Sequence, residues 1–292
     1  MHKAGFVNIV GNPNAGKSTL MNILVGERLS IITSKAQTTR HRILGIVNGE
    51  DFQIVYSDTP GIIVPQYKLQ EGMMTFVGSA LTDADVLLLV VDLTDDKPIE
   101  KKAYDRILTS KVPVLILLNK MDAVTGEGLE RSAEKWKREF PEATMIPMSA
   151  LKKKNTDIVL KKILELLPEH PAYFPKDELT DKPERFFVSE IIREKILHLY
   201  DQEIPYSVEV VVEEFQVKTT LTKIRAVIYV MRESQKGIIL GEHGSAIKKL
   251  GTSARIDIEK FIGRKVFLEL FVKVDKDWRD SDRELKRFGY LK

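Results

Sequence analysis

A short run near the start of the chain has the residue types and spacing of a phosphate-binding loop. It fits the pattern G-x-x-x-x-G-K-[ST] and reads Gly11, Asn12, Pro13, Asn14, Ala15, Gly16, Lys17, Ser18. Glycines let the backbone wrap a phosphate, and a helix expected from Thr19 onward presents unpaired N–H groups to it. In such a loop the lysine reaches the β- and γ-phosphates and the serine hydroxyl ligates Mg²⁺. We therefore expect a nucleoside triphosphate and Mg²⁺ to bind residues 11–19.

Two further motifs supply oxygen ligands around the expected Mg²⁺. Asp58 and Gly61 belong to a D-x-x-G motif after a predicted strand, where the carboxylate holds Mg²⁺ through water and the Gly61 N–H meets the γ-phosphate. A threonine in the loop 35–42 can complete the metal shell while a γ-phosphate is present. Thr38 and Thr39 are both candidates, and we favour Thr39. The predicted catalytic residues are Lys17, Thr39, Asp58 and Gly61, and the predicted Mg²⁺ ligands are Ser18, Thr39 and Asp58.

An N-K-x-D motif predicts that the bound base is guanine. Asn119, Lys120 and Asp122 come at the end of an apolar strand. A carboxylate such as Asp122 can accept from both the N1–H and the exocyclic amino group of guanine, whereas adenine lacks that arrangement of donors. Lys120 can pack its stem over the base, and Asn119 can tie the loops together. After the next strand, a backbone N–H near guanine O6 is expected from the run Ser149, Ala150, Leu151. The nucleotide should be GTP.

The residue after the D-x-x-G motif argues for slow hydrolysis. Ras-like GTPases place a water-orienting glutamine there, but this chain has Ile62, which can neither donate nor accept a hydrogen bond. A monovalent cation is one substitute. Asn14 stands where a side-chain oxygen could help to bind K⁺ near the β- and γ-phosphates, and we take K⁺ as a further candidate cofactor.

The order of apolar and amphipathic segments predicts an α/β domain that positions these motifs. A mostly parallel six-stranded sheet covered by helices is expected, with strands at Gly5–Val10, Ile43–Val47, Gln53–Ser57, Val86–Asp92, Val112–Asn119 and Thr144–Met148. Asn48-Gly49 is a hairpin signal that makes the second and third strands antiparallel. Prolines cluster after Leu167. We expect a GTPase domain at 1–167, an extended linker at 168–183 and a second domain at 184–292.

The second half has the pattern of a smaller α+β domain that binds RNA. We expect a helix at 184–200, strands at 207–217 and 222–231, a helix–glycine–helix stretch at 237–262 and a strand at 265–274. This α-β-β-α-α-β order is that of a type II KH domain, whose G-x-x-G loop clamps the backbone of single-stranded nucleotides. The predicted RNA-binding residues are Lys236, Gly241, Glu242, His243, Gly244, Lys248 and Lys249.

Charge and composition exclude several classes of protein. The 292 residues carry a formal charge of +3, but residues 1–180 hold 23 basic and 23 acidic side chains, while 218–273 hold 12 and 5. The basic excess therefore surrounds the G-x-x-G loop, as a polyanion partner requires. Without cysteine there is no disulfide scaffold or thiolate metal site, and the five histidines lack metal-ligand spacing. No apolar run is long enough to cross a bilayer and no export signal is recognisable, so we expect a cytoplasmic protein.

Taken together, the motifs resemble one family over essentially the whole chain, the Era GTPases. The resemblance is carried by G-N-P-N-A-G-K-S, K-A-Q-T-T-R-H-R, D-T-P-G-I, N-K-M-D, S-A-L and the segment from Arg232 through G-E-H-G to Val274. It implies a GTP-dependent assembly factor of the small ribosomal subunit that binds the 3′ end of its RNA. It also implies peripheral association at the inner face of the cell membrane, and we expect a monomer. Glu242 and His243 depart from the family, which commonly has a basic residue inside this loop.

Three functions remain distinguishable. In the first, GTP orders the loops around Thr39 and Asp58, and hydrolysis resets a switch that controls RNA binding. In the second, the chain is an RNA-binding assembly factor with a structural nucleotide and negligible turnover. In the third, it is a regulatory GTPase of the membrane surface, although no lipidation motif or basic amphipathic helix is evident. We favour the first.

Overall fold

The computed structural model describes residues 1–33, 35 and 37–291, which fold into two compact units. Unit 1 comprises Met1–Gln66 and Gln70–Asp181. Unit 2 comprises Tyr67–Leu69 and the chain from Lys182 onward. Within the described residues, no helix has both the length and the apolar character that spanning a bilayer requires.

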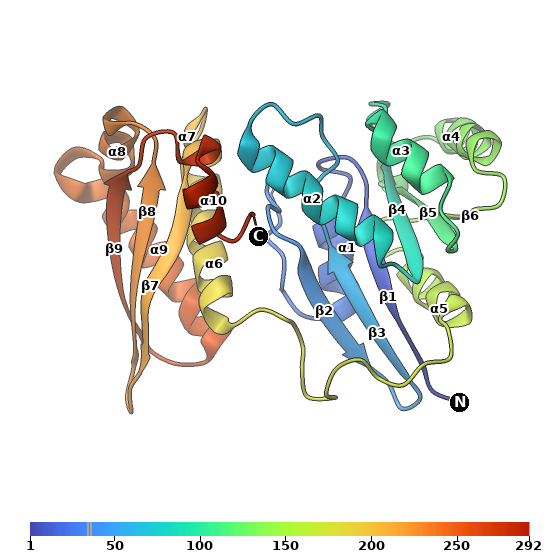
Figure 1. Cartoon of the computed structure of the whole chain (residues 1–292), viewed down its shortest axis with the longest axis horizontal. Coiled ribbons are helices and arrows are strands. Elements are labelled where there is room, and N and C mark those ends of the chain that lie inside the picture. Colours follow the sequence, from blue (N-terminus) through green and yellow to red (C-terminus); the bar gives the residue numbers. More distant parts are fainter. Residues whose placement is uncertain (34, 36, 292) are drawn as a thin grey trace. The chain divides into compact units, whose positions relative to one another are not determined.

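Unit 1 is built on a six-stranded sheet with the order β2-β3-β1-β4-β5-β6 (Figure 1). The strands are β1 (Lys3–Val10), β2 (Ile43–Asn48), β3 (Phe52–Asp58), β4 (Val86–Asp92), β5 (Val114–Asn119) and β6 (Thr144–Pro147). The strand β2 pairs antiparallel with β3 through the Asn48-Gly49 turn, and the other pairs are parallel. The predicted α/β class, the edge hairpin and the mostly parallel sheet are confirmed.

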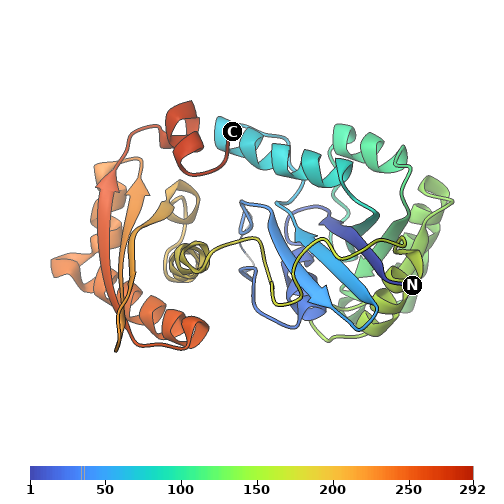
Figure 2. The same cartoon turned by 60° about the horizontal axis from the view of Figure 1, so that its bottom comes forward.

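Helices cover both faces of this sheet (Figure 2). They are α1 (Lys17–Val25), α2 (Lys68–Thr82), α3 (Lys101–Leu108), α4 (Gly126–Glu139) and α5 (Thr156–Leu166), with a short 3-10 turn η1 (Met121–Ala123). Val77 of α2, Ile107 of α3 and Trp136 of α4 share one buried cluster with Leu89 and Ile116 of the sheet. Because β1, β3, β5 and β6 all end at the same edge, the loops that follow them are brought together there.

The proline-rich segment 168–181 is extended and hydrogen-bonds along unit 1. The backbone N–H groups of Tyr173 and Phe174 donate to Gln53 Oε1 over 2.7 and 3.0 Å, and Gln53 Nε2 donates to the Phe174 carbonyl. The Ile46 N–H donates to the Leu179 carbonyl over 2.8 Å. These bonds satisfy backbone groups that an exposed linker would leave to water. They explain why the compact unit continues to Asp181, beyond the predicted boundary at residue 167.

Unit 2 is a three-stranded sheet with helices on both faces: the three longest share a core with one face, and Phe288, at the end of the last short helix, packs against Tyr229 on the other. Its elements are α6 (Glu184–Leu199), α7 (Ile204–Ser207), β7 (Glu209–Val217), β8 (Thr222–Val230), α8 (Glu233–Leu240), η2 (Glu242–Gly244), α9 (Ser245–Ile262), β9 (Val266–Val274), η3 (Trp278–Asp280) and α10 (Asp282–Arg287). β7 and β8 are antiparallel, and β8 and β9 are parallel. Apart from the short α7, the turn η2 and the C-terminal η3 and α10, the order is the predicted α-β-β-α-α-β, and the second fold class is confirmed.

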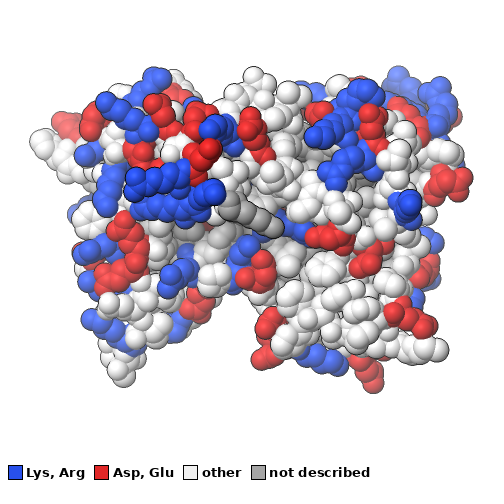
Figure 3. Space-filling model, in the orientation of Figure 1, with Lys and Arg blue, Asp and Glu red and all other residues white. Residues whose placement is uncertain are grey.

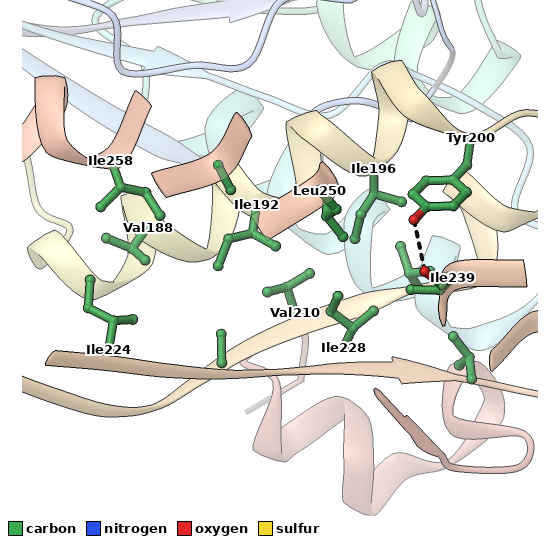
Figure 4. Packing of buried hydrophobic residues seen from close by; sticks show 14 of the residues in the cluster. Val188, Ile192, Ile196, Tyr200, Val210, Ile224, Ile228, Ile239, Leu250 and Ile258 are labelled. Atoms are coloured by element: carbon green, nitrogen blue, oxygen red, sulfur yellow. Dashed lines mark hydrogen bonds between the residues drawn. The ribbon is translucent and has the colours of Figure 1, made fainter. Parts of the chain in front are cut away.

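Branched apolar side chains form the core of unit 2. Figure 4 shows Ile192 and Ile196 of α6 on the side of the core that faces Val210 and Ile228 of the sheet, while Ile258 of α9 lies above Ile224. The buried hydroxyl of Tyr200 donates to the Ile239 carbonyl over 3.0 Å, which satisfies a polar group inside the cluster. One predicted boundary was wrong: residues 204–207 form a helical turn with Pro205 in its first turn, so the strand expected from residue 207 begins at Glu209.

Candidate functional site

The phosphate loop links β1 to α1, and the Lys17 side chain folds back to bond to its backbone. Gly11 and Gly16 have φ values of 147° and 98°, which favour glycine. A Cβ on Gly11 would lie 2.3 Å from the Val90 carbonyl oxygen. The Lys17 ammonium donates to the Asn12 carbonyl over 2.8 Å. Burial lowers the pKa of Lys17 to about 8, and the nearby Asp58 carboxylate opposes that shift.

Three oxygen-bearing side chains meet beside the phosphate loop. The Ser18 hydroxyl donates to Asp58 Oδ2 over 2.7 Å, and its oxygen lies 2.9 Å from Thr39 Oγ1. Thr39 Oγ1 also donates to Asp58 Oδ2 over 3.3 Å. Asp58 is completely buried, and its Oδ1 has no hydrogen-bond partner among the described residues. Burial raises the pKa of Asp58, while Lys17 and the hydroxyl groups oppose this. An all-oxygen set with an unsatisfied carboxylate oxygen suits a hard cation such as Mg²⁺.

The two candidate threonines have different surroundings. Thr38 Oγ1 donates to the Lys35 carbonyl over 2.6 Å and lies 2.8 Å from Thr33 Oγ1. It therefore takes part in the fold of its own loop, whereas Thr39 is buried beside Ser18. Ala36, part of the same predicted motif, lies outside the described residues.

The N-K-x-D and S-A-L motifs are connected to the phosphate loop through one side chain. Asn119 Nδ2 donates to the Ala15 carbonyl over 2.7 Å, and Asn119 Oδ1 accepts from the Ala150 N–H over 2.9 Å. The predicted link between the phosphate loop and the S-A-L loop through Asn119 is present in the structure. A hydrogen bond from Ser149 lowers the pKa of the exposed Asp122 carboxyl, which is therefore ionised at neutral pH. Lys120 has a left-handed φ of 66° and forms an ion pair with Asp92.

A cavity of about 540 Å³ joins all of these motifs. Predicted residues that line it are Asn14, Gly16, Lys17, Ser18, Thr19, both candidates Thr38 and Thr39, Gly61, Asn119, Lys120, Asp122, Ala150 and Leu151, together with Pro13. Gly11, Asn12, Ala15, Asp58 and Ser149 are not in the lining, but each bonds to a residue close to it or within it. Sequence reasoning missed Ile31 and Ile32, which also line the cavity. The only sequence feature that could have indicated them is that two apolar residues stand next to each other beside a polar loop.

Ile62 is directed into the core of unit 1. It is 3% exposed and packs in the cluster that contains Val77 of α2 and Val10 of β1. Its backbone N–H donates to the Gly11 carbonyl over 3.0 Å. The position that carries glutamine in Ras-like proteins is thus used here for packing, and its side chain does not line the cavity.

The G-x-x-G loop of unit 2 is a tight turn between α8 and α9. Gly241 and Gly244 have φ values of 69° and 76°, and a Cβ on Gly241 would lie 2.9 Å from the Ala246 backbone nitrogen. The side chains of Glu242 and His243 are 89% and 94% exposed. The predicted Lys248 and Lys249 are exposed on α9, and Lys236 is partly exposed on α8. The turn therefore presents backbone at the surface, with lysines on the adjoining helices.

Comparison with protein families divides the chain in the same way. A family described as 50S ribosome-binding GTPase matches residues 6–120, and the KH domain family matches residues 203–279. The GTPase Era of Alkaliphilus metalliredigens is 44% identical over 292 residues, which cover 99% of both chains. The GTPase Era of Staphylococcus haemolyticus is 41% identical and covers 99% of this chain and 98% of its own.

Two solved structures match over nearly the whole length. A crystal structure of Era in complex with MgGDPNP and nucleotides 1506–1542 of 16S ribosomal RNA is 38% identical, with a TM-score of 0.95 and complete coverage of both chains. A variant of Aquifex aeolicus Era bound to GDP and AlF₄⁻ is 38% identical, with a TM-score of 0.94 over 99% of this chain and 100% of its own.

Proposed function

The chain belongs to the Era family of GTPases, and on that premise we propose that it is a slow GTP-hydrolysing switch that binds the 3′ end of small-subunit ribosomal RNA during assembly of that subunit. The observation that carries the nucleotide half is the single cavity in which the phosphate loop, Thr39, Gly61 and the guanine motif meet. The G-x-x-G turn and its flanking lysines carry the RNA half.

Mg²⁺ fits the site through Ser18, Thr39 and Asp58, and the related Era with MgGDPNP supports this. When bound, the ion neutralises charge that develops on the transferred phosphoryl group. Lys17 adds a fixed positive charge, and the Gly61 N–H is available to a terminal phosphate oxygen. Since Ile62 is packed in the core and orients no water, turnover should be slow.

Replacing Thr39 with alanine should weaken binding of a non-hydrolysable GTP analogue about tenfold more than binding of GDP, because one metal ligand is lost. The measurement is the affinity for both nucleotides at several Mg²⁺ concentrations. Thr38→Ala is the matched control. It should change the ratio of the two affinities, GTP analogue to GDP, by less than about threefold, since the Thr38 hydroxyl bonds to Lys35 and Thr33. If the two variants exchange these results, Thr38 is the ligand.

The K⁺ proposal concerns Asn14, which lines the cavity with a left-handed φ of 61°. GTP hydrolysis should be at least about tenfold faster in KCl than in NaCl, because a bound K⁺ would stabilise the negative charge of the transition state. Asn14→Gly removes the side-chain oxygen without straining the backbone and should abolish the difference between the salts. Equal rates of the unmodified protein in the two salts would exclude K⁺ from the mechanism.

For the RNA half, crosslinking in cells followed by sequencing should recover the 3′ end of small-subunit ribosomal RNA. Lys248→Gln with Lys249→Gln should reduce recovery and lower affinity for that RNA about tenfold, with a salt slope smaller by about 1.4, because two phosphate contacts are lost. Lys276→Gln with Lys286→Gln is the control, since it removes the same charge from other exposed positions of unit 2. Recovery of unrelated RNA would overturn this half of the proposal.

Because the proposed partner is the small ribosomal subunit, we place the protein in the cytoplasm; that it is a monomer is a separate proposal. The two other functions suggested by the sequence are not favoured by the relatives. Peripheral membrane association remains part of the family expectation, and the vesicle measurement described below tests it. A structural nucleotide would be indicated if Lys17→Ala abolished subunit assembly while a GTP-binding variant without turnover supported it.

A further inference from the structure

Unit 1 carries a compact basic turn that the proposed function does not use. Lys152, Lys153 and Lys154 follow directly after Leu151, and all three are exposed. None of them forms an ion pair within residues 1–33, 35 and 37–291. Between Leu151 and Lys162 the chain has five lysines and one aspartate, although residues 1–180 as a whole are neutral. Figure 3 shows acidic and basic side chains interspersed over the face of unit 1 in that view, so an unbroken lysine run is a local exception.

Backbone hydrogen bonds hold this turn in one conformation. The N–H of Lys154 donates to the Ser149 carbonyl over 2.9 Å, and the Ser149 N–H donates to the Lys154 carbonyl over 3.2 Å. The Lys153 N–H donates to the Ala150 carbonyl over 3.1 Å, and Lys153 has a left-handed φ of 53°. The Lys152 N–H donates to Ser149 Oγ over 3.1 Å. Because the backbone of the turn is already ordered, binding of a ligand to the three ammonium groups would cost the protein little conformational entropy.

The chemistry of the turn points to closely spaced phosphates. Ammonium groups are compact, strongly hydrated charges that bind phosphate oxygens without demanding one geometry. Three of them on consecutive residues match a run of backbone phosphates better than a single small anion. Asp157 lies within the same stretch, and the Asp122 carboxylate interacts electrostatically with Lys152.

We propose that residues 152–154 form a second RNA-binding surface, which contacts the phosphate backbone of ribosomal RNA outside the segment held by the G-x-x-G loop. This inference rests on the proposed function, since RNA held by unit 2 raises the effective concentration of neighbouring RNA around unit 1. That argument favours RNA over an anionic membrane.

The test compares two triple variants of the full-length protein. The first is Lys152→Gln, Lys153→Asn and Lys154→Gln, in which asparagine tolerates the left-handed backbone. The control is Lys102→Gln, Lys111→Gln and Lys135→Gln, which removes the same charge from exposed positions elsewhere on unit 1. Affinity is measured for purified small ribosomal subunits and for an isolated RNA of the 3′-terminal sequence, over a range of salt concentrations. The thermal midpoint reports whether unit 1 is folded, and GDP affinity reports whether the lysines serve the nucleotide site.

The turn variant should bind small subunits about tenfold or more weakly, with a salt slope smaller by about 2, and should bind the 3′-terminal RNA and GDP normally. The control variant should match the unmodified protein. Equal subunit binding by the two variants overturns the inference, and so does a selective loss of GDP binding, which would assign the lysines to the nucleotide. Loss of binding to phosphatidylcholine–phosphatidylglycerol vesicles, with subunit binding intact, would assign them to the membrane. If the unmodified protein binds neither subunits nor RNA, the proposed function itself fails.

Discussion

Asp122→Asn should lower the affinity for GDP and GTP by about 100-fold or more and give measurable binding of the xanthine nucleotides. Its carboxylate is ionised and accepts from Ser149, which orients it at the cavity wall. Guanine offers two N–H donors to such a group, and hydrogen bonds to a charged partner contribute about 1.5–3 kcal/mol each. An asparagine amide replaces one acceptor with a donor. Xanthine carries a carbonyl where guanine has its amino group, so the pairing is restored.

The measurement is equilibrium binding of GDP and XDP to the variant and to the unmodified protein. Because Asp122 is exposed, the thermal midpoint should stay within about 2 °C. Asp96→Asn is a charge-matched control at another exposed position and should leave both affinities unchanged. Unaltered preference for guanine in Asp122→Asn would remove this residue from base recognition.

The parts of the site that could be predicted from sequence are those fixed by strand ends. Each motif directly follows an apolar strand, and parallel strands end at one edge of their sheet, so Lys17, Asp58 and Asn119 had to come together. The helix–strand order of unit 2 was equally readable. Its G-x-x-G turn lies between two amphipathic helices, where left-handed glycines are needed to reverse the chain.

Other features depended on contacts that no local pattern encodes. Our preference for Thr39 over Thr38 rests on how their loop packs, with Thr38 bonded to Lys35 and Thr39 buried at Asp58. Ile62 could be identified as unable to orient water, but its place in the core depends on the approach of α2. The attachment of segment 168–181 to the sheet of unit 1 depends on Gln53, a buried polar residue in what is otherwise an ordinary apolar strand.

The net charge of a segment predicted its surface least well, because a sum along the chain does not say where the charges lie in the fold. Residues 1–180 balance to zero, yet Lys152, Lys153 and Lys154 are held together on one turn by bonds to Ser149 and Ala150. The acidic residues that balance them are distributed over the rest of unit 1. A neutral total is therefore compatible with a local polyanion-binding surface.

Gly16→Ala should reduce GDP affinity by about 100-fold or more, because it disturbs the bond that joins the phosphate and base loops. A Cβ at this position would lie 2.2 Å from Asn119 Nδ2. The Asn119 side chain is 2% exposed and is fixed at both ends, with Nδ2 donating to Ala15 and Oδ1 accepting from Ala150. It cannot turn away without breaking one of these bonds and leaving a buried polar group unsatisfied, which costs about 1–3 kcal/mol.

Gly26→Ala provides the matched control at the other end of α1. Gly26 also has a left-handed φ, 82° against 98° for Gly16, but nothing lies within 4 Å of a Cβ placed there. Both variants therefore share the backbone strain of about 1–2 kcal/mol, and only Gly16→Ala adds the collision. Thermal midpoints and GDP affinities of the two proteins separate these effects. Gly26→Ala should lower the midpoint by a few degrees and bind GDP normally. If Gly16→Ala binds GDP as well as Gly26→Ala does, the Asn119 link contributes nothing to nucleotide binding, and the phosphate loop acts alone.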